Sequence, residues 1–99
     1  MINEFARLNV RPGQTGEFET AFTQAAGIIR KMPGFIRLNL HRHHDEAGIY
    51  LLHVQWQNIE SHRNGFRESP EYRQWRALLH HFYDPFPVVE YFETILTAD

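Results

Sequence analysis

Residues 35–56 read FIRLNLHRHHDEAGIYLLHVQW, and this stretch predicts a β-hairpin. Alternating side chains run from Phe35 to His43 and again from Ile49 to Trp56, on either side of the turn-forming residues DEAG at 45–48. If His43 pairs with Ile49, one face of the hairpin is apolar and the other is mixed. The apolar face carries Ile36, Leu38, Leu40, Leu52, Val54 and Trp56, and the mixed face carries Arg37, Asn39, His41, Leu51, His53 and Gln55.

The segment before the hairpin predicts one strand and one helix. Residues 2–10 alternate as a strand does, and they place four apolar side chains on one parity: Ile2, Ala6, Leu8 and Val10. Thr15 is expected to cap the following helix, in which apolar side chains recur at steps of three and four. The sequence Met32-Pro33-Gly34 is expected to end that helix, because proline cannot continue the hydrogen-bond ladder.

The segment after the hairpin predicts two helices and a last strand. Asn58 can cap a short helix, and Ser69-Pro70 is a strong start signal for a second one. The residues DPFP at 84–87 end the second helix, and residues 88–96 are expected to form the last strand. The resulting βαββαβ order predicts an α+β protein with a ferredoxin-like fold and an antiparallel sheet. Because no repeat or linker interrupts the 99 residues, residues 1–99 are expected to form one domain.

The predicted last strand is apolar on both of its parities. Val89, Tyr91 and Ile95 alternate with Val88, Phe92 and Leu96. Such a strand is expected to be covered on both sides, but two helices in a ferredoxin-like unit cover one sheet face only. We therefore expect a homodimer in which the mixed face, with Arg7, Asn39, His53 and the last strand, meets a second subunit.

Composition excludes several classes of function. The chain has no cysteine, which removes disulfides, thiolate metal sites and thiol nucleophiles together. Its net charge of −2, with basic side chains scattered among acids, gives no stripe for a nucleic acid. No apolar run approaches the ~20 residues of a membrane span, so no membrane partner is expected. We therefore expect a soluble cytoplasmic protein. The seven histidines show no convincing metal-ligand spacing, and there is no nucleotide-binding motif; no metal and no cofactor are expected.

Residues 56–79, WQNIESHRNGFRESPEYRQWRALL, carry a recognisable pattern. Together with VRPG at 10–13, PGF at 33–35 and the aromatic Tyr91, the pattern resembles the antibiotic biosynthesis monooxygenase (ABM) superfamily. The resemblance covers nearly the whole chain and implies a dimeric α+β barrel with a pocket between the helices and the sheet. It also implies either a cofactor-independent monooxygenase acting on phenols or quinols, a haem-degrading enzyme, or a relative without assigned activity.

Family roles can be carried over only at matching positions. In the polyketide-oxidising branch, Trp56 matches the pocket tryptophan and Arg76 matches the arginine, whereas Leu52 stands in place of an asparagine and His62 in place of a hydroxyl. In the haem-degrading branch, the positions of the histidine ligand, asparagine and tryptophan are occupied by Arg76, Ala6 and Phe66. The resemblance therefore favours the oxygenase over haem degradation.

Oxygenation without metal or flavin requires a protein that deprotonates the substrate, stabilises nascent superoxide and excludes water. We interpret His62 as the general base, because the pKa of histidine lies near neutrality, and Arg76 as the fixed positive charge. Trp56 is the third candidate catalytic residue, beside the flat substrate. The expected substrate-binding residues are Leu52, Phe66, Tyr72, Trp75 and Phe82.

Each assignment has a purely structural alternative. Tyr72, Trp75, Leu79 and Phe82 recur at steps of three, four and three, which is also the spacing of a buried helix stripe. His62 and Arg76 can be surface residues, and His53 can be a hydrogen-bonded interface residue. The leading hypothesis is a small monooxygenase that oxidises a phenol, quinol or polyketide-like aromatic. The alternatives are a dimeric binding protein for a small aromatic ligand, without turnover, and, with less support, a haem-binding or haem-degrading protein.

Overall fold

The computed structural model describes all residues from Met1 to Asp99. Four strands and two main helices alternate in the predicted βαββαβ order, and two short helices flank the second main helix. The elements are β1 (Ile2–Asn9), α1 (Thr15–Ile29), β2 (Phe35–Arg42), β3 (Ile49–Trp56), the π-helix η1 (Ser61–Phe66), α2 (Pro70–Leu79), the 3₁₀-helix η2 (His80–Phe82) and β4 (Val89–Phe92).

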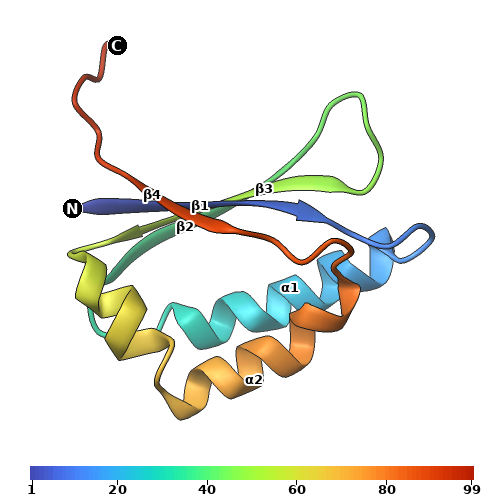
Figure 1. The fold of residues 1–99 in the computed structure, drawn as a ribbon, viewed down its shortest axis with the longest axis horizontal. Coiled ribbons are helices and arrows are strands. Elements are labelled where there is room, and N and C mark those ends of the chain that lie inside the picture. Colours follow the sequence, from blue (N-terminus) through green and yellow to red (C-terminus); the bar gives the residue numbers. More distant parts are fainter.

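The four strands form one antiparallel sheet in the order β2-β3-β1-β4. All helices lie on one face of this sheet, as Figure 1 shows, so the fold is the expected ferredoxin-like α+β arrangement. The core lies between the helices and the sheet, and its largest fully buried side chains include Trp56, Phe18 and Phe66. No helix is long and apolar enough to span a membrane.

The hairpin has the predicted register at its turn and a different one at its far end. The backbone N–H of His43 donates to the carbonyl oxygen of Ile49 over 2.8 Å, which confirms the predicted pair. A β-bulge between Phe35 and Arg37 then shifts the register, so that Phe35 and not Ile36 lies opposite Trp56. The expected place of Ile36 on the buried face is therefore wrong, and its side chain is exposed.

The start signals of the C-terminal helices are confirmed. Asn58 Oδ1 accepts from the backbone N–H of Ser61 over 2.9 Å, and Ser69 Oγ accepts from that of Tyr72 over 3.2 Å. The first main helix differs at both ends. Thr15 is its first residue and not its cap, and the helix ends at Ile29, before the predicted stop at residues 32–34.

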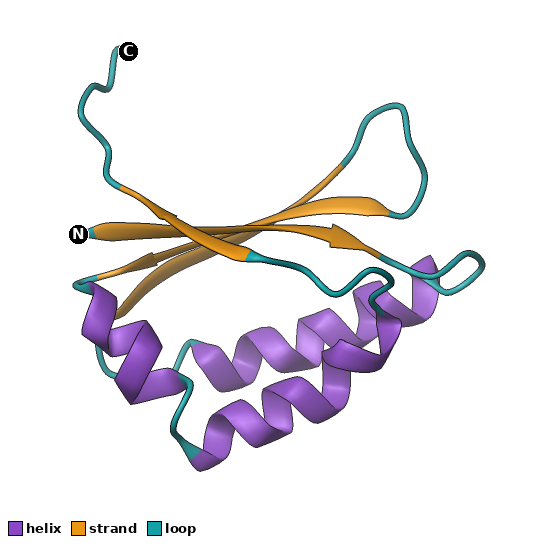
Figure 2. Cartoon of the chain, in the orientation of Figure 1, coloured by secondary structure: helices purple, strands orange, loops and turns teal.

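The last strand is shorter than predicted. It spans only Val89–Phe92, and the segment beyond it leaves the sheet on the side away from the helices (Figure 2). Ile95 and Leu96, expected within the strand, are 96% and 81% exposed in the single chain. The strand ends where its pairing ends, because β4 pairs with β1 only from Asn3 to Ala6 and has no other neighbour.

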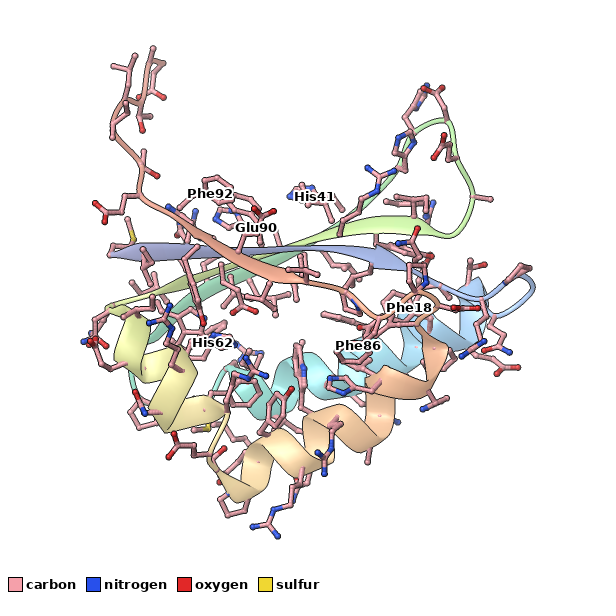
Figure 3. The ribbon with its side chains drawn as sticks, viewed as in Figure 1. Phe18, His41, His62, Phe86, Glu90 and Phe92 are labelled. Atoms are coloured by element: carbon pink, nitrogen blue, oxygen red, sulfur yellow. The ribbon has the colours of Figure 1, made fainter.

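The sheet face away from the helices is uncovered and of mixed character. Figure 3 places His41, Glu90 and Phe92 on this outer face. The buried amide of Asn3 donates to the carbonyl oxygen of Phe92 over 3.1 Å and accepts from His53 Nε2 over 2.8 Å. His53 thus forms the hydrogen bond expected of a structural histidine, and its ring stacks on Phe5 with centroids 4.3 Å apart.

Candidate active site

A pocket of about 180 Å³ lies between the sheet and the helices η1 and α2. Figure 3 shows His62 and Phe86 on the helix side of the sheet, and both side chains line this pocket. Fourteen residues form the lining, nine of them hydrophobic. They are Glu4, Ala6, Leu8, Leu52, His62, Phe66, Arg67, Tyr72, Trp75, His80, Tyr83, Phe86, Pro87 and Val89. Mostly apolar walls with few polar groups are typical of a small-molecule site.

A buried carboxyl group, that of Glu4, organises one part of the pocket. The Trp56 indole Nε1–H donates to Glu4 Oε1 over 2.9 Å, and His62 Nε2 lies 3.4 Å from the same oxygen. On the other side of the imidazole ring, the Tyr91 hydroxyl lies 2.5 Å from His62 Nδ1. The neutral tautomer with its hydrogen on Nε2 satisfies both contacts, because the carboxylate cannot donate and the tyrosine hydroxyl can.

Burial disfavours the charged form of both groups. Loss of water around Glu4 raises the pKa of its carboxyl group to about 7, although the hydrogen bond from Trp56 and the charge of Arg67 oppose this shift. Burial, followed by the charges of Arg67 and Arg63, lowers the pKa of His62 to about 4. Near neutral pH the pair therefore gains or loses one proton, and that proton belongs to the pair as a unit. A group that titrates near the working pH is suited to general acid–base catalysis.

Arg67 is the fixed positive charge of the pocket. Its guanidinium group lies over the ring of Tyr72, 5.8 Å from the ring centre, and forms no salt bridge. Its side chain is exposed, and its backbone N–H donates to the carbonyl oxygen of His62 over 3.0 Å, so its main chain lies one helical turn after that of His62. Glu4 is the only acidic side chain in the lining.

The structure brings five of the eight predicted site residues together in this pocket: Leu52, His62, Phe66, Tyr72 and Trp75. The other three lie elsewhere. Trp56 is fully buried outside the lining and reaches the site only through its hydrogen bond to Glu4. Arg76 is exposed on α2, and Phe82 packs in the core against Phe18, with ring centroids 5.6 Å apart.

Sequence reasoning missed nine residues of the lining: Glu4, Arg67, His80, Ala6, Leu8, Tyr83, Phe86, Pro87 and Val89. A signal for Glu4 was present, because it is the one charged residue on the strand parity that also carries Ile2, Ala6, Leu8 and Val10. Arg67 had no such signal, because it directly follows a π-helix. A prediction that assumes the α-helical repeat of 3.6 residues assigns its side chain to the wrong direction around the helix axis.

The histidines of the pocket are poorly placed as ligands for haem or a metal. Both ring nitrogens of His62 face a protein group, and the His80 ring packs against Tyr72 and Phe86. No three His, Asp or Glu side chains gather in a metal-binding group. A pocket of about 180 Å³ is also smaller than the ~300–1,000 Å³ of sites for drug-sized ligands, so a porphyrin does not fit it.

A larger hollow of about 510 Å³ between α1 and the edge strand β2 is less suited to chemistry. Its polar groups satisfy one another: Glu19 accepts from the Tyr50 hydroxyl over 2.6 Å and from Arg42 Nη2 over 3.0 Å. The hydrogen bond from Tyr50 and then that from Arg42 lower the pKa of Glu19. No group of this hollow is left free to take up a proton near neutral pH.

Comparison with known proteins gives matches in both sequence and fold. A family model described as antibiotic biosynthesis monooxygenase matches residues 1–78. The uncharacterized protein YczJ of Bacillus subtilis is 48% identical over 95 residues, which make up 96% of this chain and 100% of YczJ.

Two solved structures are similar over almost their whole length. A Bordetella bronchiseptica protein assigned to the antibiotic biosynthesis monooxygenases has a TM-score of 0.91 and 29% identity, covering 96% of this chain and 97% of its own. SnoaB, a cofactor-independent oxygenase from Streptomyces nogalater, has a TM-score of 0.85 and 23% identity, covering 97% of this chain and 94% of its own.

The buried pair gives the protein a pH-dependent stability that Glu4→Gln should change. The pKa of Glu4 is raised from 4.5 to about 7, so the folded protein binds this proton more tightly than the unfolded chain does. Between these two pH values, ionisation of Glu4 therefore lowers the free energy of unfolding of the wild type as the pH rises. The lowered pKa of His62 acts in the opposite direction between about 4 and 6.5. Glu4→Gln removes the first effect, and we expect its free energy of unfolding relative to wild type to rise by up to about 3 kcal/mol across that window.

Urea denaturation at a series of pH values measures this difference. Glu17→Gln, at an exposed carboxylate on α1, is the matched control, and its difference from wild type should stay nearly constant above pH ~6. A flat difference for Glu4→Gln would show that the carboxyl group ionises as it does in the unfolded chain, and a falling difference would show that folding lowers its pKa; either result contradicts the raised pKa.

Proposed function

Because this chain belongs to the antibiotic biosynthesis monooxygenase family, we propose that it is a cofactor-independent monooxygenase that oxidises a small phenol or quinol with dioxygen. The observation that carries the proposal is the buried Glu4–His62 pair beside a small, mainly apolar pocket. The pair supplies a proton acceptor that is itself shielded from water, which suits the first step of this chemistry.

The reaction begins with loss of the phenolic proton to the pair. The resulting phenolate transfers one electron to dioxygen, and the substrate radical and superoxide combine to form a carbon–oxygen bond. The pair then returns its proton to the peroxide, and the hydroperoxide loses water to leave a carbonyl group. One oxygen atom enters the substrate and the other leaves as water, so no external reductant is needed.

The same proton also serves as the electrostatic partner of the oxygen intermediates. After it has moved to the pair, it lies beside the site where superoxide forms, and a fixed hydrogen-bond donor stabilises such an anion strongly in a dry site. The arginine role implied by the family resemblance is not needed at Arg76, whose side chain is exposed and does not line the pocket. Trp56 acts as a positioning residue, because its indole N–H fixes the carboxyl group of Glu4.

We also propose that a second copy of the chain covers the outer sheet face. Phe92, Ile95 and Leu96 are exposed on or beside this face, and apolar patches of this kind are rare on monomers. The charges on the two edge strands are complementary, because Arg37 and His41 lie on β2 and Glu90 lies on β4. A two-fold arrangement that brings β4 against β2 of the second copy would pair these charges. When two such sheets face each other across a two-fold axis parallel to the strands, each β4 meets the partner's β2.

Oxygen uptake tests the enzymatic proposal. We expect wild-type protein to oxidise catechols or hydroquinones faster than buffer autoxidation, after exhaustive chelation and without added flavin or nicotinamide. Glu4→Gln and His62→Gln should each lower the rate by about 10²-fold to 10⁴-fold, and the loss should shrink at high pH, where the substrate ionises unaided. His81→Gln, an exposed histidine outside the pocket, is the control and should keep the wild-type rate.

Rates that never exceed autoxidation on single-ring and two-ring substrates would contradict the oxygenase. Saturable binding of the same compounds without oxygen uptake would then identify the protein as a binder of small aromatic ligands.

Sedimentation velocity tests the second copy. We expect wild type to sediment at twice the chain mass at micromolar concentration, and Phe92→Asp to shift the population towards the monomer because it buries a charge in the contact. Ala77→Glu, on the exposed side of α2, should leave the dimer intact. Monomeric wild-type protein would contradict this arrangement.

A further inference from the structure

The pocket has one permanent charge. Arg67 is the only lysine or arginine in the lining, and the only carboxyl group there is that of Glu4, which is 4% exposed. Like several other exposed arginines of the chain, Arg67 has no carboxylate partner within 4 Å, but it is the one that lines the pocket. The pocket therefore presents an uncompensated cation to whatever enters it.

The guanidinium group contacts an aromatic ring and uses none of its donors. It lies over the ring of Tyr72, and the main chain that carries it is hydrogen-bonded to the carbonyl oxygen of His62. A cation over an aromatic face keeps its N–H groups free at its edge, where they can bind a carboxylate with two parallel hydrogen bonds. The charge of Arg67 also opposes the charging of His62 and His80 and favours the ionised form of Glu4, as a nearby cation does.

We propose that the ligand is a single-ring phenol that carries a carboxylate, which Arg67 binds while the phenolic hydroxyl group meets the Glu4–His62 pair. The proposal deepens the proposed function and rests on it only for the phenolic end of the ligand. The carboxylate provides the guanidinium group with an anionic partner, which a neutral phenol would not.

Size restricts the ring system. A cavity of ~150 Å³ in another protein holds one benzene molecule, so about 180 Å³ accommodates one ring with small substituents. Phe66, Tyr72 and Trp75 meet edge to face around the pocket, with centroids 5.2 and 5.5 Å from Phe66, and provide a rigid aromatic wall for that ring. Two-ring and three-ring substrates would have to project past the exposed Phe86.

Charge at the inner end is compatible with an acid. Because burial raises the pKa of Glu4 to about 7, only part of this group is ionised at neutral pH, so it repels an incoming carboxylate less than a fully ionised carboxylate would. Tyr91, Arg63 and Arg67 face or flank the pair, and none of them adds negative charge at that pH. The carboxylate therefore meets one cation and no fixed anion.

Anaerobic binding tests the proposal separately from catalysis. The probes are 2-, 3- and 4-hydroxybenzoate and the methyl ester of each, followed by quenching of tryptophan fluorescence, since Trp75 lines the pocket. We expect the best acid to bind wild type about 10-fold to 100-fold more tightly than its ester, the usual range for a charge-assisted hydrogen bond. Arg67→Gln should reduce the affinity for the acid to that for the ester and leave the ester unchanged.

Two further variants sharpen the result. Arg67→Lys should keep part of the preference, because an ammonium group keeps the charge but cannot form the two parallel bonds. Arg73→Gln, an exposed arginine of α2 outside the lining, should bind like wild type. Circular dichroism confirms that each variant is folded.

The outcomes separate this proposal from the proposed function. Equal binding of acid and ester to wild type, equal loss of both in Arg67→Gln, or no binding of either at millimolar concentration would overturn the carboxylate anchor. Tight, Arg67-dependent binding of the acid without oxygen uptake would support the anchor and contradict the oxygenase. Oxygen uptake above autoxidation, together with equal binding of each acid and its ester, would support the oxygenase and overturn the carboxylate anchor.

Discussion

The burial of one carboxyl group, that of Glu4, is the constraint on which the site depends. Its strand parity directs it into the core between sheet and helices, where an unpartnered carboxylate is costly. The Trp56 indole N–H and the His62 ring supply the partners, and Tyr91 completes the chain. These contacts connect β1, β3, η1 and β4 at one point, so the proton-binding group is also a structural junction.

That junction places two chemically different groups in one pocket. The buried Glu4–His62 pair gains or loses a proton near neutral pH, whereas Arg67 supplies a permanent charge close to it. The aromatic side chains of the lining add shape and little charge. A small aromatic molecule with one ionisable hydroxyl group and one anionic group matches this arrangement, because each of its polar groups then meets its chemical complement.

Much of the fold was predictable because it depends on local signals. The alternation in residues 35–56, the caps at Asn58 and Ser69 and the turn register all follow from side chains near in sequence. The bulge that exposes Ile36 and the early end of β4 depend on strand pairing, which local patterns do not encode. The site was predictable at Leu52, at His62 and at the three aromatic residues Phe66, Tyr72 and Trp75. Glu4 and Arg67 come from β1 and from the end of a π-helix, and their approach to His62 is a product of tertiary packing.

The central claim is that the buried pair takes a proton from a phenol bound in the pocket. Anaerobic absorption spectra of 4-nitrophenol with excess protein test it directly, because the ionised phenol absorbs at longer wavelength than the neutral form. If the pair takes up this proton, bound nitrophenol ionises at a lower pH than free nitrophenol in wild type, and Glu4→Gln and His62→Gln abolish this shift. An unchanged ionisation on binding, or the same shift in both variants, would contradict it.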